Sequence, residues 1–262
     1  MSIQNFPLTS IQKVRKYIRG SLLLTASAKS ASAVALTDDI PEPESIDELS
    51  GIFTFGAPSP PDTSVSNSVE KWVVSTVNPA APLLKLPGLK LKPGFRLVSY
   101  LYHTAEGGVG VVWAVPEALG TMVQLEASLK GSNSMASVPK PAGALGHFME
   151  AIEGDRSPVS FMIASLLRRE LQEFGSLGDR HNWNQHDLIA DVPPNLSWQW
   201  RADPPKNFLP KVRISPDGQA AVEFFTCRHT VPTTLYRHVD RYPVHQYRGD
   251  SLDKSVAVAR SE

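Results

Sequence analysis

Two glycine-containing turns constrain the fold of this chain more than any other feature of its sequence. Residues 215–218 (Ser-Pro-Asp-Gly) interrupt a β-type stretch that extends from 211 to 228. Proline presets the backbone for such a turn, and glycine adopts the left-handed conformation that closes it. Residues 104–108 (Thr-Ala-Glu-Gly-Gly) divide a similar stretch from 95 to 115. The sequence therefore predicts two β-hairpins.

The strongest helix signal lies between the two hairpins, at residues 157–175. Ser157 is a good N-cap, and Pro158 suits the first helical position, where its missing N–H costs nothing. Apolar residues then recur at helical spacing, and Gly175 is a typical helix end. We expect a long, well-capped helix in the middle of the fold.

Weaker patterns complete the secondary structure. They predict helices at 117–130, 144–153 and 250–258, and strands at 72–77, 197–201 and 233–239. Strands then gather at the two ends of the body and helices in its middle. This order predicts an α+β fold with a mainly antiparallel sheet from two hairpin regions and a central helical pair.

The charges of the first 68 residues fall into two blocks of opposite sign. Residues 1–37 contain five Lys or Arg and no acidic residue, whereas residues 38–68 contain seven Asp or Glu and no basic one. Ile11, Val14 and Ile18 recur at helical spacing and predict a basic amphipathic helix in the first block. The second block is rich in Pro and Ser, and such a segment buries too little apolar surface to order itself.

We therefore divide the chain into a basic N-terminal segment (1–37), a disordered acidic linker (38–68) and one α+β domain (69–262), which we expect to fold alone. The N-terminal segment has three alternative roles. It packs on the domain, it targets the chain to an organelle, or its residues 10–24 contact a membrane surface or a partner. The cytoplasm is the expected compartment, with organelle targeting as the alternative.

Composition argues against several classes of function. The chain has 26 Lys and Arg and 26 Asp and Glu, so it lacks the basic excess of a general nucleic-acid binder. Its single cysteine, Cys227, excludes an intramolecular disulfide and a cysteine-rich zinc site. Neither a phosphate-binding glycine motif nor Gly-x-Ser-x-Gly is present, so we expect no cofactor.

The densest polar cluster lies at residues 181–187. His181, His186 and Asp187 carry side chains that bind metals, and they define a metal-assisted hydrolase as an alternative function. However, the two histidines are five residues apart, not the four that place both imidazoles on one helical face in His-Glu-x-x-His. A polar loop is the preferred interpretation.

Cys227 and His229 are a weaker catalytic candidate. On an extended strand they share one face with Glu223 and lie ~7 Å apart, too far for direct proton transfer. A small buried hydrophobe is therefore the preferred interpretation of Cys227. Arg168 and Arg169, on the long central helix, are expected on a solvated face with local ion pairs.

The C-terminal quarter is locally basic, with tyrosines between its cations, and such a surface can bind RNA or an acidic partner. The candidate binding residues are Arg228, Tyr236, Arg237, Arg241, Tyr242 and Arg248.

The function expected from these observations is that of a non-catalytic accessory or assembly protein. It would bind another protein or complex and be positioned by its N-terminal segment. A metal-assisted hydrolase is the first alternative and an RNA-associated protein the second, although nucleic acid is not the expected partner. The expectation stands on the missing catalytic motifs and on the segregated N-terminal charges.

Overall fold

A computed structural model of the chain describes residues 1–22, 70–104, 107–175 and 183–260. Within these ranges the protein is a mixed α+β fold in which every strand pairing is antiparallel. The predicted α+β class with a mainly antiparallel sheet is confirmed. The predicted linker (38–68) and residues 23–37 lie outside the described residues.

The strands form three sheets. The largest has the order β1 (Ser2–Asn5), β9 (Lys211–Ile214), β10 (Ala220–Arg228), β11 (Thr234–Tyr242), β12 (Asp250–Ala259) and β8 (Trp198–Trp200), with β7 (His186–Ile189) also paired to β10. The second contains β2 (Trp72–Val74), β4 (Phe95–Thr104) and β5 (Gly107–Pro116), and the third contains β3 (Leu89–Leu91) and β6 (Ile152–Gly154).

The helices are few. They are α1 (Leu8–Ser21), α2 (Met122–Ala127) and α3 (Pro158–Gln172), with 3₁₀ turns η2 (Ala81–Leu84), η3 (Glu117–Leu119), η4 (Phe148–Ala151) and η6 (Trp183–Gln185).

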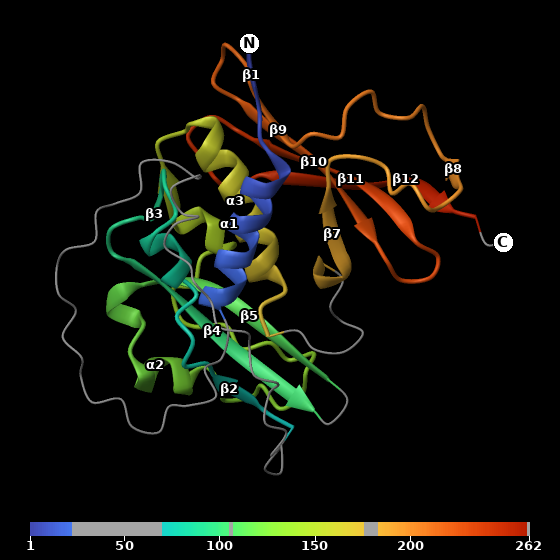
Figure 1. Ribbon diagram of the computed structural model, residues 1–262. Coiled ribbons are helices and arrows are strands. Elements are labelled where there is room, and N and C mark those ends of the chain that lie inside the picture. Colours follow the sequence, from blue (N-terminus) through green and yellow to red (C-terminus); the bar gives the residue numbers. More distant parts are fainter. Residues whose placement is uncertain (23–69, 105–106, 176–182, 261–262) are drawn as a thin grey trace.

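Helix α3 is the centre of the molecule. It contacts β9 and β10 of the large sheet, β5 of the β4–β5 hairpin, and α1, which lies beside it (Figure 1). All of its residues from Ser160 to Leu171 are buried. A helix that is buried on all sides belongs to the interior of a domain. Helix α3 therefore joins the large sheet to the β4–β5 hairpin.

Both predicted hairpins and the capped helix are confirmed. β4 pairs with β5 along its whole length, and β9 pairs with β10 through the turn that contains Gly218, at φ +83°. The Ser157 side chain accepts a hydrogen bond from Ser160 N at 3.1 Å, which caps α3. Gly175 follows the helix with φ +70°, a conformation that residues other than glycine rarely adopt.

Two of the weaker predicted helices are wrong, the first in extent and the second in type. Residues 117–130 form only the turn η3 and the short helix α2, which begins after a capping box made by Thr121 and Gln124. Residues 144–153 contain the 3₁₀ turn η4 and then strand β6. The partner of α3 is therefore α1, not a helix at 144–153, and the predicted central helical pair is corrected accordingly.

The predicted C-terminal helix at 250–258 is strand β12. The side chains of Ser251 and Asp253 bond to groups on β11, whereas those of Leu252 and Lys254 lie on the other face of the strand. Pairing with β11 also satisfies the backbone groups of that strand's edge. These gains depend on a neighbouring strand and are absent from the local sequence pattern.

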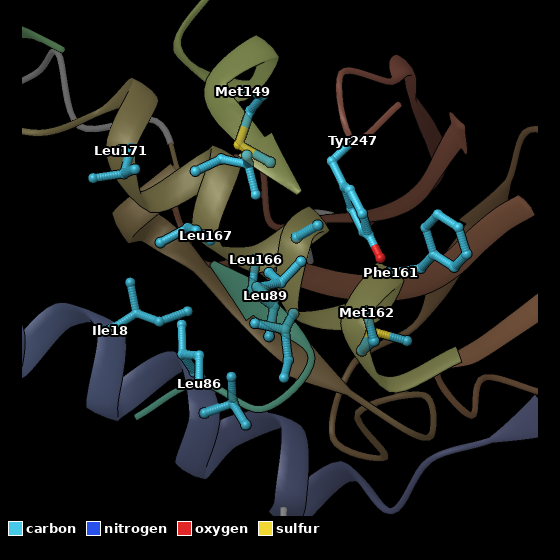
Figure 2. Close-up of a cluster of buried hydrophobic side chains, with 14 of the residues drawn as sticks. Ile18, Leu86, Leu89, Met149, Phe161, Met162, Leu166, Leu167, Leu171 and Tyr247 are labelled. Carbon is cyan, nitrogen blue, oxygen red and sulfur yellow. The ribbon is translucent and has the colours of Figure 1, made fainter. Parts of the chain in front are cut away.

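The first 22 residues are part of the domain. Strand β1 pairs with β9, and Ile11, Val14 and Ile18 of α1 are buried in the main core. Figure 2 shows Ile18 in one cluster with side chains of α3. Residues 1–22 therefore pack in the same core as the domain, and the apolar face of α1 is covered by that core.

No helix within the described ranges is both long enough and apolar enough to cross a membrane.

Replacing Ile18 with alanine should test whether α1 belongs to the core. We expect Ile18→Ala to lower the free energy of unfolding by about 2–5 kcal/mol, because it leaves a cavity at a fully buried position. Lys13→Ala, on the exposed side of the same helix, should change it by less than about 0.5 kcal/mol. Urea denaturation followed by circular dichroism measures both. Equal effects would show that α1 is not part of the folding unit.

Candidate functional site

The metal cluster that the sequence offered as an alternative is not assembled by its described members, His186 and Asp187. His181 lies outside the described residues. His186 is buried on the helix side of the large sheet, whereas Asp187 is exposed and pairs with His229 at 3.0 Å. Successive side chains of a strand point to opposite faces, so His186 and Asp187 cannot bind one metal ion together. Over the described ranges no group of three His, Cys, Asp or Glu is placed to hold a metal.

The proposed thiol pair does not assemble either. Cys227 is buried among Leu235, Val256 and Ala257, and desolvation by burial raises the pKa of its thiol. His229 pairs with Asp187 instead of approaching the sulfur. The thiol is therefore held protonated, away from an imidazole that could activate it.

The candidate binding residues separate into internal and external groups. Tyr242 is buried, and its hydroxyl lies 2.8 Å from that of Ser165. Burial raises the pKa of Tyr242. Arg248 pairs with Glu150, and the Arg228 guanidinium lies 5.4 Å from the Tyr236 ring centroid. Only Arg237 and Arg241 are exposed on the outer face of the sheet.

A network of buried charges joins α1 to α3. Arg15 Nε and Arg19 Nε donate to the two oxygens of Glu170, each at 2.8 Å. Arg15 also donates to the backbone oxygens of Trp183 and His186. Because Arg15 and Glu170 are nearly inaccessible to solvent, each charge depends on the other for its compensation.

The same network joins α3 to the large sheet. Arg168 Nη2 and Arg169 Nη2 each donate to Asp240 Oδ1 at 2.9 Å, and Asp240 is fully buried. Arg169 Nη2 also donates to Asp253 Oδ1 at 2.9 Å. The prediction that Arg168 and Arg169 lie on a solvated face is therefore wrong. They turn toward the sheet because its inward positions carry the carboxylates that compensate them.

A chain of four side chains crosses the inner face of the large sheet. Asp253 Oδ1 lies 2.7 Å from His238 Nδ1, and His238 Nε2 lies 2.8 Å from Thr226 Oγ1. Thr226 Oγ1 lies 2.7 Å from His186 Nδ1. We call these four residues the histidine chain. They come from β12, β11, β10 and β7, so only the assembled sheet brings them together.

Burial lowers the pKa values of both histidines. Desolvation, together with His238, Arg228 and Arg15, lowers the pKa of His186 to about 3. Desolvation also lowers the pKa of His238, where Arg169 acts in the same direction and Asp253 opposes it. The pKa of Asp253 is lowered by His238 and Arg169 even though desolvation acts against this. The chain therefore ends in an ionised carboxylate.

A cavity of about 160 Å³ opens beside the histidine chain. We call it the α3–sheet cavity. Its lining residues are Arg169, Gln172, Glu173, Trp183, His186, Tyr236, His238 and Asp253. Strand alternation places polar side chains here, but nothing in the local sequence distinguishes this inward stripe from an outward one. Sequence reasoning identified His186, Tyr236 and Arg169 for other roles and did not bring any of the lining residues together in one site.

The opposite face of the large sheet forms a second candidate site. Its side chains alternate along the strands with those that point toward α3, and α1 and α3 cover the other face (Figure 1). We define the open basic face by Lys211, Arg213, Arg237, Arg241, Lys254, Glu223 and Asp250. Five cations thus stand against two carboxylates, and Leu252 and Ile3 are 58% and 57% exposed on the same face.

Glu223 organises the centre of the open basic face. Lys211 Nζ and Arg237 Nη2 each lie 3.1 Å from its carboxylate, and Arg213 also pairs with it. Despite the opposing effect of burial, the hydrogen bonds from Arg237 and Lys211 lower the pKa of Glu223. One ionised carboxylate therefore holds three cations in place and leaves an excess of positive charge.

A scan against protein-family models, a search of curated proteins and a search of solved structures each found no match to this chain.

Replacing Asp240 with asparagine should test the buried network. We expect Asp240→Asn to lower the free energy of unfolding by about 3–5 kcal/mol, because Arg168 and Arg169 lose the charge that compensates them. Asp250→Asn removes an exposed carboxylate from the same sheet and should have little effect. Chemical denaturation of both variants gives the difference. A small effect of Asp240→Asn would mean that the network is solvated.

The buried histidines predict a specific loss of stability in acid. Because their folded-state pKa values lie below the unfolded value near 6.5, the unfolded state binds more protons than the folded state as the pH falls below about 6.5. Stability should fall by roughly 1.4 kcal/mol per pH unit for each such proton.

One variant isolates the contribution of His186 to this loss. His186→Asn should reduce the pH slope by about one proton relative to the wild type, because the imidazole whose pKa is lowered is gone. Urea denaturation at a series of pH values measures the slope. An unchanged slope in His186→Asn would contradict the assignment.

Proposed function

We propose that the chain is a non-catalytic accessory protein that binds an acidic surface of another protein through the open basic face. The observation that carries this proposal is the excess of five cations over two carboxylates on an accessible sheet face. Complementary charge accelerates encounter and selects a partner, whereas exposed apolar side chains provide the desolvated part of an interface.

The apolar residues on the same face favour a protein partner. Leu252 and Ile3 are more than half exposed, and Val239 lies opposite Leu252 on β11, between Arg237 and Arg241. A surface that only attracts phosphates needs cations alone. The mixture of aliphatic and basic side chains is what a protein interface with a charged rim contains.

The positions of the tyrosines weigh against the RNA alternative. Single-stranded nucleic acids bind to surfaces on which exposed aromatic rings stack with the bases. Tyr242 and Tyr247 are buried, and Tyr236 lines the α3–sheet cavity on the opposite side of the sheet. The sequence suggested that tyrosines alternate with the cations of this region. Instead, these three tyrosines do not lie on the open basic face.

The location of α1 modifies the expected role of the N-terminus. Residues 1–22 are held by the core, so they cannot act as a detachable basic tether. Only β1 of this segment contributes to the open basic face, through Ile3, which pairs with Arg213 of β9. We propose that the folded surface, rather than a mobile basic helix, selects the partner.

Charge reversal on the open basic face tests the proposal. The double variant Arg241→Glu, Lys254→Glu should weaken binding to a partner isolated with the wild-type chain at least tenfold, because both cations are exposed. The matched control is Lys71→Glu, Lys130→Glu, which makes the same charge change at exposed positions outside the sheet face. Titration calorimetry with the purified partner measures the affinities.

Three results would contradict the proposal. The two double variants bind the partner equally, the wild-type chain binds no protein under native conditions, or the face variant loses its fold while the control retains it. If fluorescence anisotropy instead shows salt-sensitive binding of a single-stranded RNA, lost only in the face variant, the RNA alternative replaces this proposal.

A further inference from the structure

The outer edge of β12 is paired along only part of its length. Strand β8 pairs with Ala257–Ala259, and Arg201 N donates to the backbone oxygen of Val256. Within the described ranges no strand pairs with this edge at residues 250–255. Residues 250–254 are exposed, so the edge is accessible. An open edge of a sheet presents unpaired N–H and C=O groups on which another strand can assemble.

The side chains along this open edge are self-complementary. Ser251 and Asp253 bond to groups on the α3 side of the sheet, so Asp250, Leu252 and Lys254 point to the other face. The acid and the base stand symmetrically about Leu252, which is 58% exposed. When two such strands pair antiparallel with Leu252 on the two-fold axis, Asp250 of each copy lies opposite Lys254 of the other, and the two Leu252 side chains meet.

The side chains fit one register of this symmetric pair. With the axis at Leu252, Ser251 lies opposite Asp253 of the second copy on the inner face, and no like charges face each other. An axis at Asp250, Asp253 or Lys254 would set two like charges directly opposite each other, which is destabilising. An axis at Ser251 would place Asp250 opposite Leu252 and leave its charge without a partner across the interface.

The charges on this edge select a second copy over other strands. Charged side chains on an edge strand generally disfavour the addition of another strand. Within the described ranges neither Asp250 nor Lys254 forms an ion pair with another residue of its own chain. In the symmetric pair each of them gains a partner of opposite charge, and the interface contains two such ion pairs. A strand that lacks this pattern leaves at least one of the charges unpaired.

The neighbouring elements leave room for this pairing. The paired positions end at Lys254, two residues before Val256, to which Arg201 is bonded. The strand of the second copy begins at its Asp250, opposite Lys254, and the preceding Arg248 turns to Glu150 of its own chain. The second copy therefore leaves the edge before it reaches β8. The contact is short, so the association should depend on concentration.

We propose that two copies of the chain associate through the open edge of β12, with Leu252 on a two-fold axis, so that their large sheets form one continuous sheet. The axis is perpendicular to the sheet, which keeps the two open basic faces on one side of the dimer. The contact is made between copies of this chain, so it does not depend on the proposed function.

Sedimentation velocity of the full chain tests the association, and charge variants test its register. We expect the wild type to pass from monomer to dimer as its concentration rises toward about 1 mM. In Lys254→Asp and in Asp250→Lys both ion pairs become pairs of like charge, so the dissociation constant should rise at least tenfold.

A charge exchange provides the matched control. The double variant Asp250→Lys, Lys254→Asp restores both ion pairs with their signs reversed, so its dissociation constant should lie within about threefold of the wild-type value. The exchange leaves the net charge of the open basic face unchanged. It therefore separates association of the chain from the binding of an acidic partner.

Cross-linking tests the position of the axis. Leu252→Cys brings two thiols opposite each other in the dimer, and oxidation with diamide should join them in a disulfide. Ile3→Cys is the matched control, because Ile3 is 57% exposed on the same face but lies away from the axis. The native Cys227 is buried and should not react. Non-reducing electrophoresis should show covalent dimer forming at least tenfold faster in Leu252→Cys than in Ile3→Cys.

The wild-type measurement decides the proposal even if a variant fails to fold. The proposal is overturned if the wild type stays monomeric up to about 1 mM, or if the folded single charge variants dimerise as the wild type does. It is also overturned if the folded double variant dimerises no better than the single variants, or if Ile3→Cys cross-links as fast as Leu252→Cys.

Discussion

The ion pairs of α3 determine how α1 and the large sheet pack against this helix. Glu170 binds Arg15 of α1, and Arg168 and Arg169 bind Asp240 of β11. Buried ion pairs add little net stability, since desolvation offsets most of their attraction, but a mispaired charge is severely unfavourable. The network therefore selects one arrangement of α1, α3 and the large sheet. This is why the N-terminal helix, whose composition suggested a detachable segment, is part of the domain.

Strands β11 and β12 carry both candidate sites because their side chains alternate. His238 and Asp240 of β11 point toward α3, and Arg237 and Arg241 point away. One pair of strands thus contributes the acid–base groups of the α3–sheet cavity and the cations of the open basic face. The two sites are separated only by the thickness of the sheet.

Local signals predicted the parts of the fold whose causes are local. The Pro-Asp-Gly turn before β10 and the Ser157 cap of α3 act within a few residues, and both were predicted correctly. Strand β12 was predicted as a helix because its stabilising partners, β11 and the Arg169 guanidinium, are distant in sequence. The candidate site was harder still. Of the histidine chain only His186 was identified, and then with Asp187, which points to the other face.

The sequence by itself determined the α+β class, the two hairpins and the single well-capped helix, because turn, cap and periodicity act over short distances. The tertiary structure alone decided that the basic N-terminal helix enters the core and that Arg168 and Arg169 are buried. It also decided that four polar residues from four strands form one chain. A charged side chain becomes buried only where another element supplies its counter-charge, and the position of that element is not encoded in the neighbouring residues.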